Sequence, residues 1–170
     1  LVDHLNKCRE MTYKGPKTDL SFSIKNRIWI NSDGKTNMPS GEVFTGPLED
    51  SVNGKVHFDY PALYRGEEVR GISLEIKNGR VEKWSAERGE NVLGEVMKIK
   101  GARHFGEVAI GTNYNITKAT KNILFDEKIG GTIHMALGQS YKQTGGKNES
   151  LIHWDLISDM TEGEIFADGE

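Results

Sequence analysis

The sequence predicts an α+β fold that is strand-rich, with a mainly antiparallel, barrel-like sheet and a few helices. Leu20, Phe22 and Ile24 alternate with polar residues, which is the period of a strand with one buried face. The pair Asn78-Gly79 separates two such runs and is a strong signal for a two-residue hairpin. Helical periodicity is confined to two stretches, so strands should outnumber helices.

The first dozen residues have helical spacing. Leu1, Leu5, Cys8 and Met11 recur at intervals of three and four. We expect one helix here, closed by the breaker Gly15-Pro16.

The middle of the chain reads as antiparallel sheet. After residues 19–24, a second strand is expected at 27–30, followed by a turn at 31–34. Further strands are expected at 55–60, 68–77 and 79–85. Residues 87–98 return to a helical pattern, with Val92, Leu93, Val96 and Met97 on one face. Short strands bounded by glycines follow at 106–111, 131–138 and 151–157.

Composition narrows the class of protein. A chain of 170 residues fits one domain, and no internal boundary divides residues 1–170. The net charge of -3 argues against a nucleic-acid partner, and no apolar run is long enough for a membrane span. The single cysteine, Cys8, favours a small core residue in a cytoplasmic protein. Because the chain opens at Leu1 on a helical pattern, we interpret it as part of something longer.

The run 151–157 carries the best local signal for chemistry. Alternation places His153 and Asp155 on one face of a strand, with Ile152 and Trp154 on the other. An imidazole and a carboxylate two residues apart on a rigid strand can hold a divalent cation. An exposed edge strand with a polar outer face would have the same pattern.

Two more glycine-bounded strands share this design. His134 points away from Ile133 and Met135, and Glu107 points away from Val108. Two histidines with several carboxylates suit a mixed nitrogen and oxygen site for Zn, Co or Mn. Other groups of residues are weaker candidates for a functional site. Residues 145–147 lack the spacing of a phosphate-binding loop. We interpret His4, His57 and His104 as surface or structural residues, with His104 also a candidate to support a metal ligand.

Four longer runs keep a common order and spacing: PSGEVFTGP at 39–47, GEVAIG at 106–111, LFDEKIGGTIH at 124–134 and NESLIHWD at 148–155. Together they resemble the thermophilic metallo-aminopeptidases, the aminopeptidase T and aminopeptidase S group. The resemblance covers essentially the whole chain and corresponds to the C-terminal metal-binding half of that family. It implies that a separate N-terminal domain normally precedes this one.

The resemblance implies a pair of divalent metal ions, with Zn, Co or Mn as candidates. The implied ligands are Glu42, Glu107, His134, Tyr141, His153 and Asp155. Glu42 and Tyr141 enter through the resemblance alone, since each lies in a loop-like, glycine-rich context. Asp126, Glu127 and Lys128 fit either a cleft beside the metals or a solvated turn.

The implied activity is metal-dependent release of N-terminal amino acids from peptides with a free N-terminus. Two ions would activate a water, with Glu107 as the bridging ligand and Tyr141 assisting at the oxyanion. The resemblance also implies a homodimer. Three rivals stay open: another two-metal hydrolase acting on amides or phosphoesters, a non-catalytic binding or dimerisation domain, and a catalytic domain that is inert in isolation. Release of an N-terminal amino acid distinguishes the first rival, and metal content the second.

Overall fold

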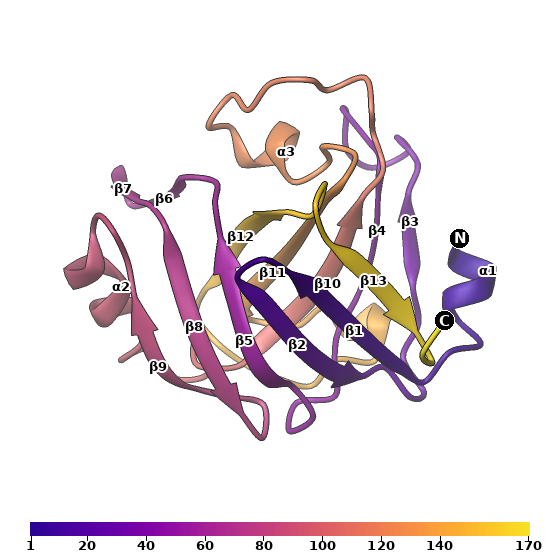
Figure 1. Ribbon diagram of the computed structural model, residues 1–170, viewed down its shortest axis with the longest axis horizontal. Coiled ribbons are helices and arrows are strands. Elements are labelled where there is room, and N and C mark those ends of the chain that lie inside the picture. The colour runs from indigo at the N-terminus through magenta and orange to yellow at the C-terminus, as the bar shows by residue number, and fades with distance from the viewer.

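Two large antiparallel sheets dominate the structure, a computed structural model that describes residues 1–170 (Figure 1). The six-stranded sheet has the order β13-β1-β2-β5-β8-β9. Its strands are β1 (Glu10–Gly15), β2 (Thr18–Ser23), β5 (Asn53–Phe58), β8 (Ile72–Lys77), β9 (Arg80–Ser85) and β13 (Glu164–Ala167). Every pairing in it is antiparallel.

The five-stranded sheet lies behind the first in Figure 1 and has the order β12-β11-β10-β4-β3. Its strands are β3 (Ile30–Ser32), β4 (Glu42–Thr45), β10 (Phe105–Gly111), β11 (Thr132–Gly138) and β12 (His153–Asp159). A separate hairpin pairs β6 (Ala62–Tyr64) with β7 (Glu67–Val69). The predicted α+β class with mainly antiparallel strands is confirmed, although the two large sheets stay open and form no closed barrel.

The core lies between the two sheets, because each turns one apolar face inward. Met11 and Phe22 enter it from the six-stranded sheet, and Met135 and Leu156 enter it from the five-stranded sheet. They belong to one cluster of 30 buried residues. The five-stranded sheet therefore has one face committed to the core, and the side chains of its other face are available for a site.

The helices are short: α1 (Val2–Leu5), α2 (Glu90–Val96), α3 (Ile123–Asp126) and the 3-10 turn η1 (Lys142–Thr144). No helix has the length and apolarity needed to cross a lipid bilayer. The helix expected at 87–98 is confirmed in its central seven residues, where Val92, Leu93 and Val96 are buried. It begins only after Gly89, whose positive φ of 75° turns the chain.

The prediction of one helix over residues 1–12 is wrong, because only Val2–Leu5 is helical. After α1 ends at Leu5, the chain extends into β1, in which Met11 and Tyr13 are buried and their neighbours are not. Pairing of β1 with both β2 and β13 supplies backbone hydrogen bonds on both edges. Two ladders and a buried face outweigh the weak helical spacing of four apolar residues.

The strands expected at 27–30 and 68–77 also differ from the structure. The strand expected at 27–30 begins at Ile30 and runs to Ser32, so the turn starts later than 31. The run 68–77 is divided into β7 and β8 at Arg70-Gly71, because Gly71 has a φ of 61° that a continuous strand does not allow. The hairpin at Asn78-Gly79 is confirmed, with φ of 49° and 77°.

Two hairpins allow a matched test of the Asn78-Gly79 turn. Gly66 and Gly79 follow residues of positive φ and have φ of 84° and 77°. A Cβ at Gly66 meets nothing, whereas a Cβ at Gly79 collides with the carbonyl oxygen of Glu49. Gly66→Ala should cost about 1 kcal/mol of backbone strain, and Gly79→Ala about 3 kcal/mol or more. Urea unfolding of both variants measures the difference, and equal losses would contradict the collision.

Candidate metal centre

Three neighbouring strands, β10, β11 and β12, bring their polar side chains together on the face that is turned away from the core. Ala136 of β11 pairs with Glu107 on one side and with Asp155 on the other. His134 lies two residues back on the same face, and His153 is paired with Gly138. Alanine and glycine between these longer side chains leave the space that an ion and its ligands require.

A β-bulge at Gly106 directs Glu107 to this face. Phe105 pairs with Leu137 and is buried in the core, whereas Glu107 pairs with the next residue back, Ala136. The extra residue in β10 therefore places Phe105 and Glu107 on opposite faces, although regular alternation would put them on the same one. A Cβ at Gly106 would collide with the carbonyl oxygen of Gln139, so glycine is required there.

His134 is the centre of the cluster and is fully buried. Its Nε2 lies 3.0 Å from Glu107 Oε1 and 3.1 Å from Glu42 Oε2. Glu42 comes from β4, on the far side of β10 from His134. Both carboxylates are themselves about 5 % exposed, Glu42 at 6 % and Glu107 at 5 %. Burial of two carboxylates around one imidazole is costly unless a cation or proton is shared among them.

The second half of the cluster is the pair on β12. His153 Nε2 lies 3.4 Å from Asp155 Oδ1 and 3.6 Å from Glu107 Oε2. The other nitrogen, Nδ1, is 2.8 Å from the carbonyl oxygen of Gln139, and this contact fixes the ring. The two oxygens of Glu107 thus face different histidines, so Glu107 joins the two halves.

Two residues that the sequence left undecided belong to this site. The end of α3 places Glu127 close to Glu42 and His134, with one potential ligand atom of each within 4.8 Å of the others. Lys128 is fully buried, its Nζ 3.4 Å from Glu42 Oε1 and in direct contact with Glu127 Oε1. A solvated turn is therefore excluded for both. Asp126 is also buried, but it faces the preceding loop.

Tyr141 stands at the edge of the site rather than in its centre. Its ring is 4.8 Å from that of His153 and 5.7 Å from that of Phe44, centroid to centroid, and 44 % of the residue is exposed. It lines a cavity of about 210 Å³ together with Glu42, Glu107 and Asp155. Five of the six residues implied by the resemblance, including the two that alternation did not select, line this cavity, and the sixth, His134, contacts Glu42 and Glu107.

The surroundings raise the pKa of three of these groups, for different reasons. Burial lowers the pKa of His153, but the hydrogen bond and charge of Asp155 outweigh it and raise that pKa to about 9. Burial and the charge of Glu42 raise the pKa of Glu127 to about 7. Burial, with the charges of Glu107 and Asp155, raises the pKa of Tyr141 to about 12. Without a metal the cluster holds protons, which an entering cation must displace.

The donor set fits divalent cations. His134 Nδ1 is buried without a hydrogen-bond partner in the protein, and the only contact of Asp155 Oδ1 is the 3.4 Å ion pair with His153 Nε2. Two groups of three residues have candidate ligand atoms within 4.8 Å of one another: Glu42, Glu127 and His134, and Glu107, His134 and Asp155. Imidazole nitrogen with carboxylate oxygen suits Zn, Co or Mn. Bound cations would offset the negative charge of the buried carboxylates, which the single positive charge of Lys128 does not balance.

The loop that precedes α3 is fixed by Asp126, which therefore also positions Glu127 and Lys128. The carboxylate of Asp126 accepts from Thr120 N at 2.7 Å, from Thr120 Oγ1 at 2.9 Å and from Lys121 N at 2.8 Å. These are partly buried, charge-assisted hydrogen bonds.

Replacing Asp126 by Ala should destabilise the protein by about 2 kcal/mol or more, because the donors of the 120–121 backbone lose a charged acceptor. Denaturant unfolding measures the loss, and hydrogen exchange at Thr120 and Lys121 locates it. Asp33→Ala is the control, because Asp33 pairs with Lys35 on the surface and should change little. Equal stability of the two variants would contradict a structural role for Asp126.

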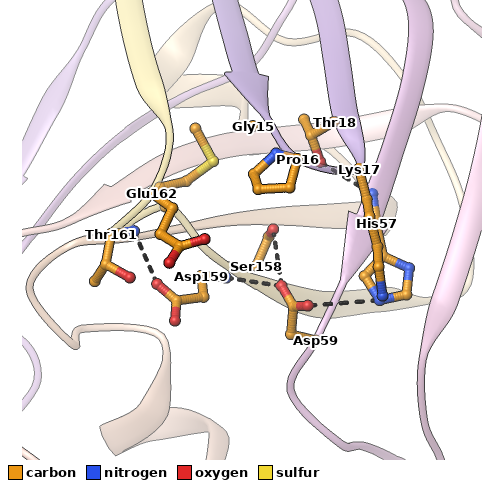
Figure 2. Close-up of a pocket in the computed structure, with 11 residues that line it drawn as sticks. Gly15, Pro16, Lys17, Thr18, His57, Asp59, Ser158, Asp159, Thr161 and Glu162 are labelled. Carbon is orange, nitrogen blue, oxygen red and sulfur yellow. Dashed lines mark hydrogen bonds and ion pairs between the residues drawn. The ribbon is translucent and has the colours of Figure 1, made fainter.

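A second histidine and aspartate with the same spacing lie in a different environment (Figure 2). His57 Nε2 is 3.5 Å from Asp59 Oδ1, beside a cavity of about 310 Å³. Figure 2 shows Asp59 between His57 and Ser158; its Oδ2 accepts from Ser158 Oγ at 3.4 Å and from Asp159 N at 3.2 Å. His57 Nδ1 contacts Ser73 Oγ at 2.8 Å. This pair is satisfied by protein groups, and no second histidine joins it.

The buried cluster of imidazoles and carboxylates is a candidate metal-binding site. Comparison with known proteins gives the family: all residues from 1 to 170 match the family described as thermophilic metalloprotease (M29). This chain belongs to that family, and the resemblance to the aminopeptidase T and aminopeptidase S group is confirmed.

Two curated relatives illustrate the match. Aminopeptidase AmpS of Bacillus subtilis (strain 168) is 32 % identical over 201 residues, covering 99 % of this chain and 49 % of the relative. Aminopeptidase T of Thermus thermophilus is 30 % identical over 197 residues, covering 99 % and 48 %. The chain thus spans about half the length of the curated relatives it matches.

Solved structures agree on the fold. Wild-type AmpT from Thermus thermophilus superposes with a TM-score of 0.86 at 31 % identity, covering 99 % of this chain and 49 % of that one. A 2,5-dihydroxypyridine dioxygenase from Pseudomonas putida KT2440 reaches a TM-score of 0.77 at 18 % identity, covering 98 % and 54 %. The second likeness concerns the fold alone.

Proposed function

We propose that this chain carries the catalytic metal site of an aminopeptidase, which binds two divalent ions and releases N-terminal amino acids from peptides. The proposed ligands are Glu42, Glu107, His134, Tyr141, His153 and Asp155, with Glu127 added from its position beside Glu42 and His134. The observation that carries the proposal is the buried cluster around His134, in a chain that belongs to a metalloprotease family.

Two bound divalent ions would supply an acidified water and polarisation of the scissile carbonyl. Glu107 is the best candidate to be shared between them, because its two oxygens face His134 at 3.0 Å and His153 at 3.6 Å. The ammonium group of Lys128 contacts Glu42 and Glu127 and fixes their positions, while Lys128 itself is fully buried.

Tyr141 is suited to act at the open side of the cavity. As long as Tyr141 does not itself bind an ion, its phenol remains protonated at neutral pH, because burial and nearby carboxylates raise its pKa to about 12. A protonated phenol can donate a hydrogen bond to the oxygen that becomes negative during attack on the peptide carbonyl. Packing of its ring against His153 and Phe44 orients the hydroxyl.

The test uses the 170-residue chain loaded with Zn or Co and a short peptide with a free N-terminus. We expect release of the N-terminal amino acid, no release from the N-acetylated peptide, and a loss of about hundredfold or more in Glu107→Gln, since loss of a shared ligand should cost at least as much as loss of a residue that supports a ligand. Equal cleavage of the acetylated peptide would indicate another hydrolase. Inactivity of the chain with both ions bound would overturn the claim that this unit is catalytic by itself.

A further inference from the structure

A second group of charged side chains surrounds a cavity of about 440 Å³, within the range of cavities that bind small molecules. The cavity is lined by the turn that follows α2 and by Arg80 at the start of β9. Figure 1 shows α2 beside β9, at the edge of the six-stranded sheet opposite β13. We call it the basic pocket. Its basic lining residues are Arg80, Lys98, Lys100, Arg103 and His104.

The lining of the basic pocket contains no carboxylate. The whole sequence has 25 acidic residues against 22 lysines and arginines, so a surface patch of average composition would carry both signs. One ion pair involves a pocket residue, that of Lys98 Nζ with Glu95 Oε1 at 2.5 Å. The other lysines and arginines in ion pairs lie outside the pocket. The charges of Arg80, Lys100 and Arg103 therefore have no carboxylate partner.

Backbone pairing holds several of these basic residues side by side. An isolated antiparallel β-bridge joins Arg80 to His104, and the amide of Val81 donates to the carbonyl oxygen of Arg103 at 2.8 Å. The fold thus brings like charges together, and their mutual repulsion is unfavourable until an anion enters between them.

Arg103 is the most firmly held of the cations. It is half-buried, and its guanidinium carbon lies 4.7 Å from the ring centroid of Trp84 on β9. Stacking of this kind covers one face of the guanidinium group and leaves the N–H groups at its edge able to donate to a ligand.

The turn that carries Lys100 and Gly101 is fixed by the segment before β12. Asn148 Nδ2 donates to the carbonyl oxygen of Gly101 at 2.9 Å, and Ser150 Oγ donates to that of Lys100 at 2.7 Å. A Cβ at Gly101 would collide with the carbonyl oxygen of Glu149, so this turn is tightly packed. The pocket wall is therefore in place before a ligand arrives, which lowers the cost of binding.

The number and kind of these charges indicate the chemistry of the ligand. Four lysines and arginines around one cavity match an anion with several negative charges, whereas a single carboxylate would offset only one of them. Guanidinium groups present paired N–H donors that fit phosphate oxygens, and ammonium groups add compact positive charges.

We infer that the basic pocket binds a small molecule that carries two or more phosphate groups. The inference is independent of the proposed function, because no residue that lines the metal cavity also lines this pocket. Nucleic acid is a less suitable ligand. Apart from the four pocket cations, the other 18 of the 22 lysines and arginines face 25 acidic residues, so the rest of the chain carries a net charge of about -7 and would repel a long polyanion.

Pyrophosphate is the probe that tests this inference. It is titrated into the 170-residue chain after metal ions and chelator have been removed, because phosphates also bind metal ions. The buffer contains about 0.1 M sodium chloride, which screens attraction between distant charges. We expect saturable binding at one site per chain by calorimetry, with the largest amide shifts in NMR spectra at Lys100, Gly101 and Arg103. The same spectra verify that the chain is folded.

Lys100→Gln and Arg80→Gln are the test variants, because each removes one charge from an exposed side chain. Each should weaken pyrophosphate binding by about tenfold, the loss expected for one charge-assisted contact. Lys83→Gln is the matched control. Lys83 is also exposed on β9, but it pairs with Glu75 at 2.7 Å and does not line the basic pocket, so its variant should bind like the wild type.

Three outcomes would overturn the inference. Absence of saturable binding, or equal losses in Lys83→Gln and the two test variants, would show that the pocket is not a specific site. Succinate that binds as tightly as pyrophosphate would contradict the preference for phosphate. A ten-nucleotide single strand of DNA that binds more tightly than pyrophosphate, and loses affinity in the test variants, would assign this surface to nucleic acid instead.

Discussion

Replacing His153 by Ala is expected to lower the metal content of the purified chain from about two ions to at most one. His153 contributes a nitrogen between Asp155 and Glu107, at 3.4 Å and 3.6 Å from their oxygens, and alanine offers no ligand in its place. Elemental analysis after chelation, reloading with zinc and removal of free ion gives the count. Release of N-terminal amino acids should fall together with the metal.

His57→Ala is the matched control for this substitution. It removes an imidazole that also lies two residues before an aspartate, at 3.5 Å, but in the pocket of Figure 2 rather than at the metal centre. Metal content should equal that of the wild type. If His153→Ala retained two ions per folded chain, or if both variants lost metal equally, His153 would not be a ligand.

Metal loading is expected to raise the thermal midpoint of unfolding by roughly 10 °C. Ions that bind only the folded chain contribute about 4 kcal/mol when present at a thousandfold excess over the dissociation constant. The folded cluster is buried and its carboxylates lie together, whereas the unfolded chain separates them. Differential scanning calorimetry with zinc and with chelator measures the shift.

Variants test whether the shift of the thermal midpoint on metal loading arises at the cluster around His134. Glu107→Gln should reduce it strongly, because Glu107 contacts both histidines. His57→Ala should show the shift of the wild type, even if its own midpoint is lower. A midpoint that does not respond to metal, in a chain that folds cooperatively, would count against a metal site in this protein.

Alternation along strands predicted a large part of the site. Glu107, His134, His153 and Asp155 were selected because each stands among apolar neighbours on a short strand, and the structure places all of them on one face of the five-stranded sheet. Period-two geometry is local, so one sequence suffices to read it. Which strands are neighbours is not local, and their proximity came from the resemblance.

The residues that the sequence left undecided depend on contacts between distant segments. Glu127 and Lys128 follow a short helix in a loop that, read alone, suggests a solvated turn, yet Lys128 is fully buried against Glu42 from β4. The bulge at Gly106 interrupts the alternation between Phe105 and Glu107, and the sequence did not predict it. At the N-terminus, pairing with β13, more than 150 residues away, overrides the helical spacing of the first dozen residues.

The two pairs of histidine and aspartate also show what a local sequence pattern does not determine. In both, the imidazole and the carboxylate are two residues apart in sequence and about 3.5 Å apart in space. Only the pair at 153 and 155 is met by a third charged side chain, Glu107. The spacing of a histidine and an aspartate therefore indicates a possible ligand pair. Whether that pair belongs to a metal site depends on the side chains of the neighbouring strand.

The buried lysine has a consequence for the order in which ions are taken up. Glu42, Glu107, Glu127 and Asp155 crowd around the cavity, and Lys128 offsets one of their charges. The first dication displaces the protons that the cluster holds, and the second then enters a space in which Lys128 and the first ion already offset most of the carboxylate charge. The two ions should therefore bind with unequal affinity. In a titration with limiting zinc, chains that carry one ion should accumulate before chains that carry two.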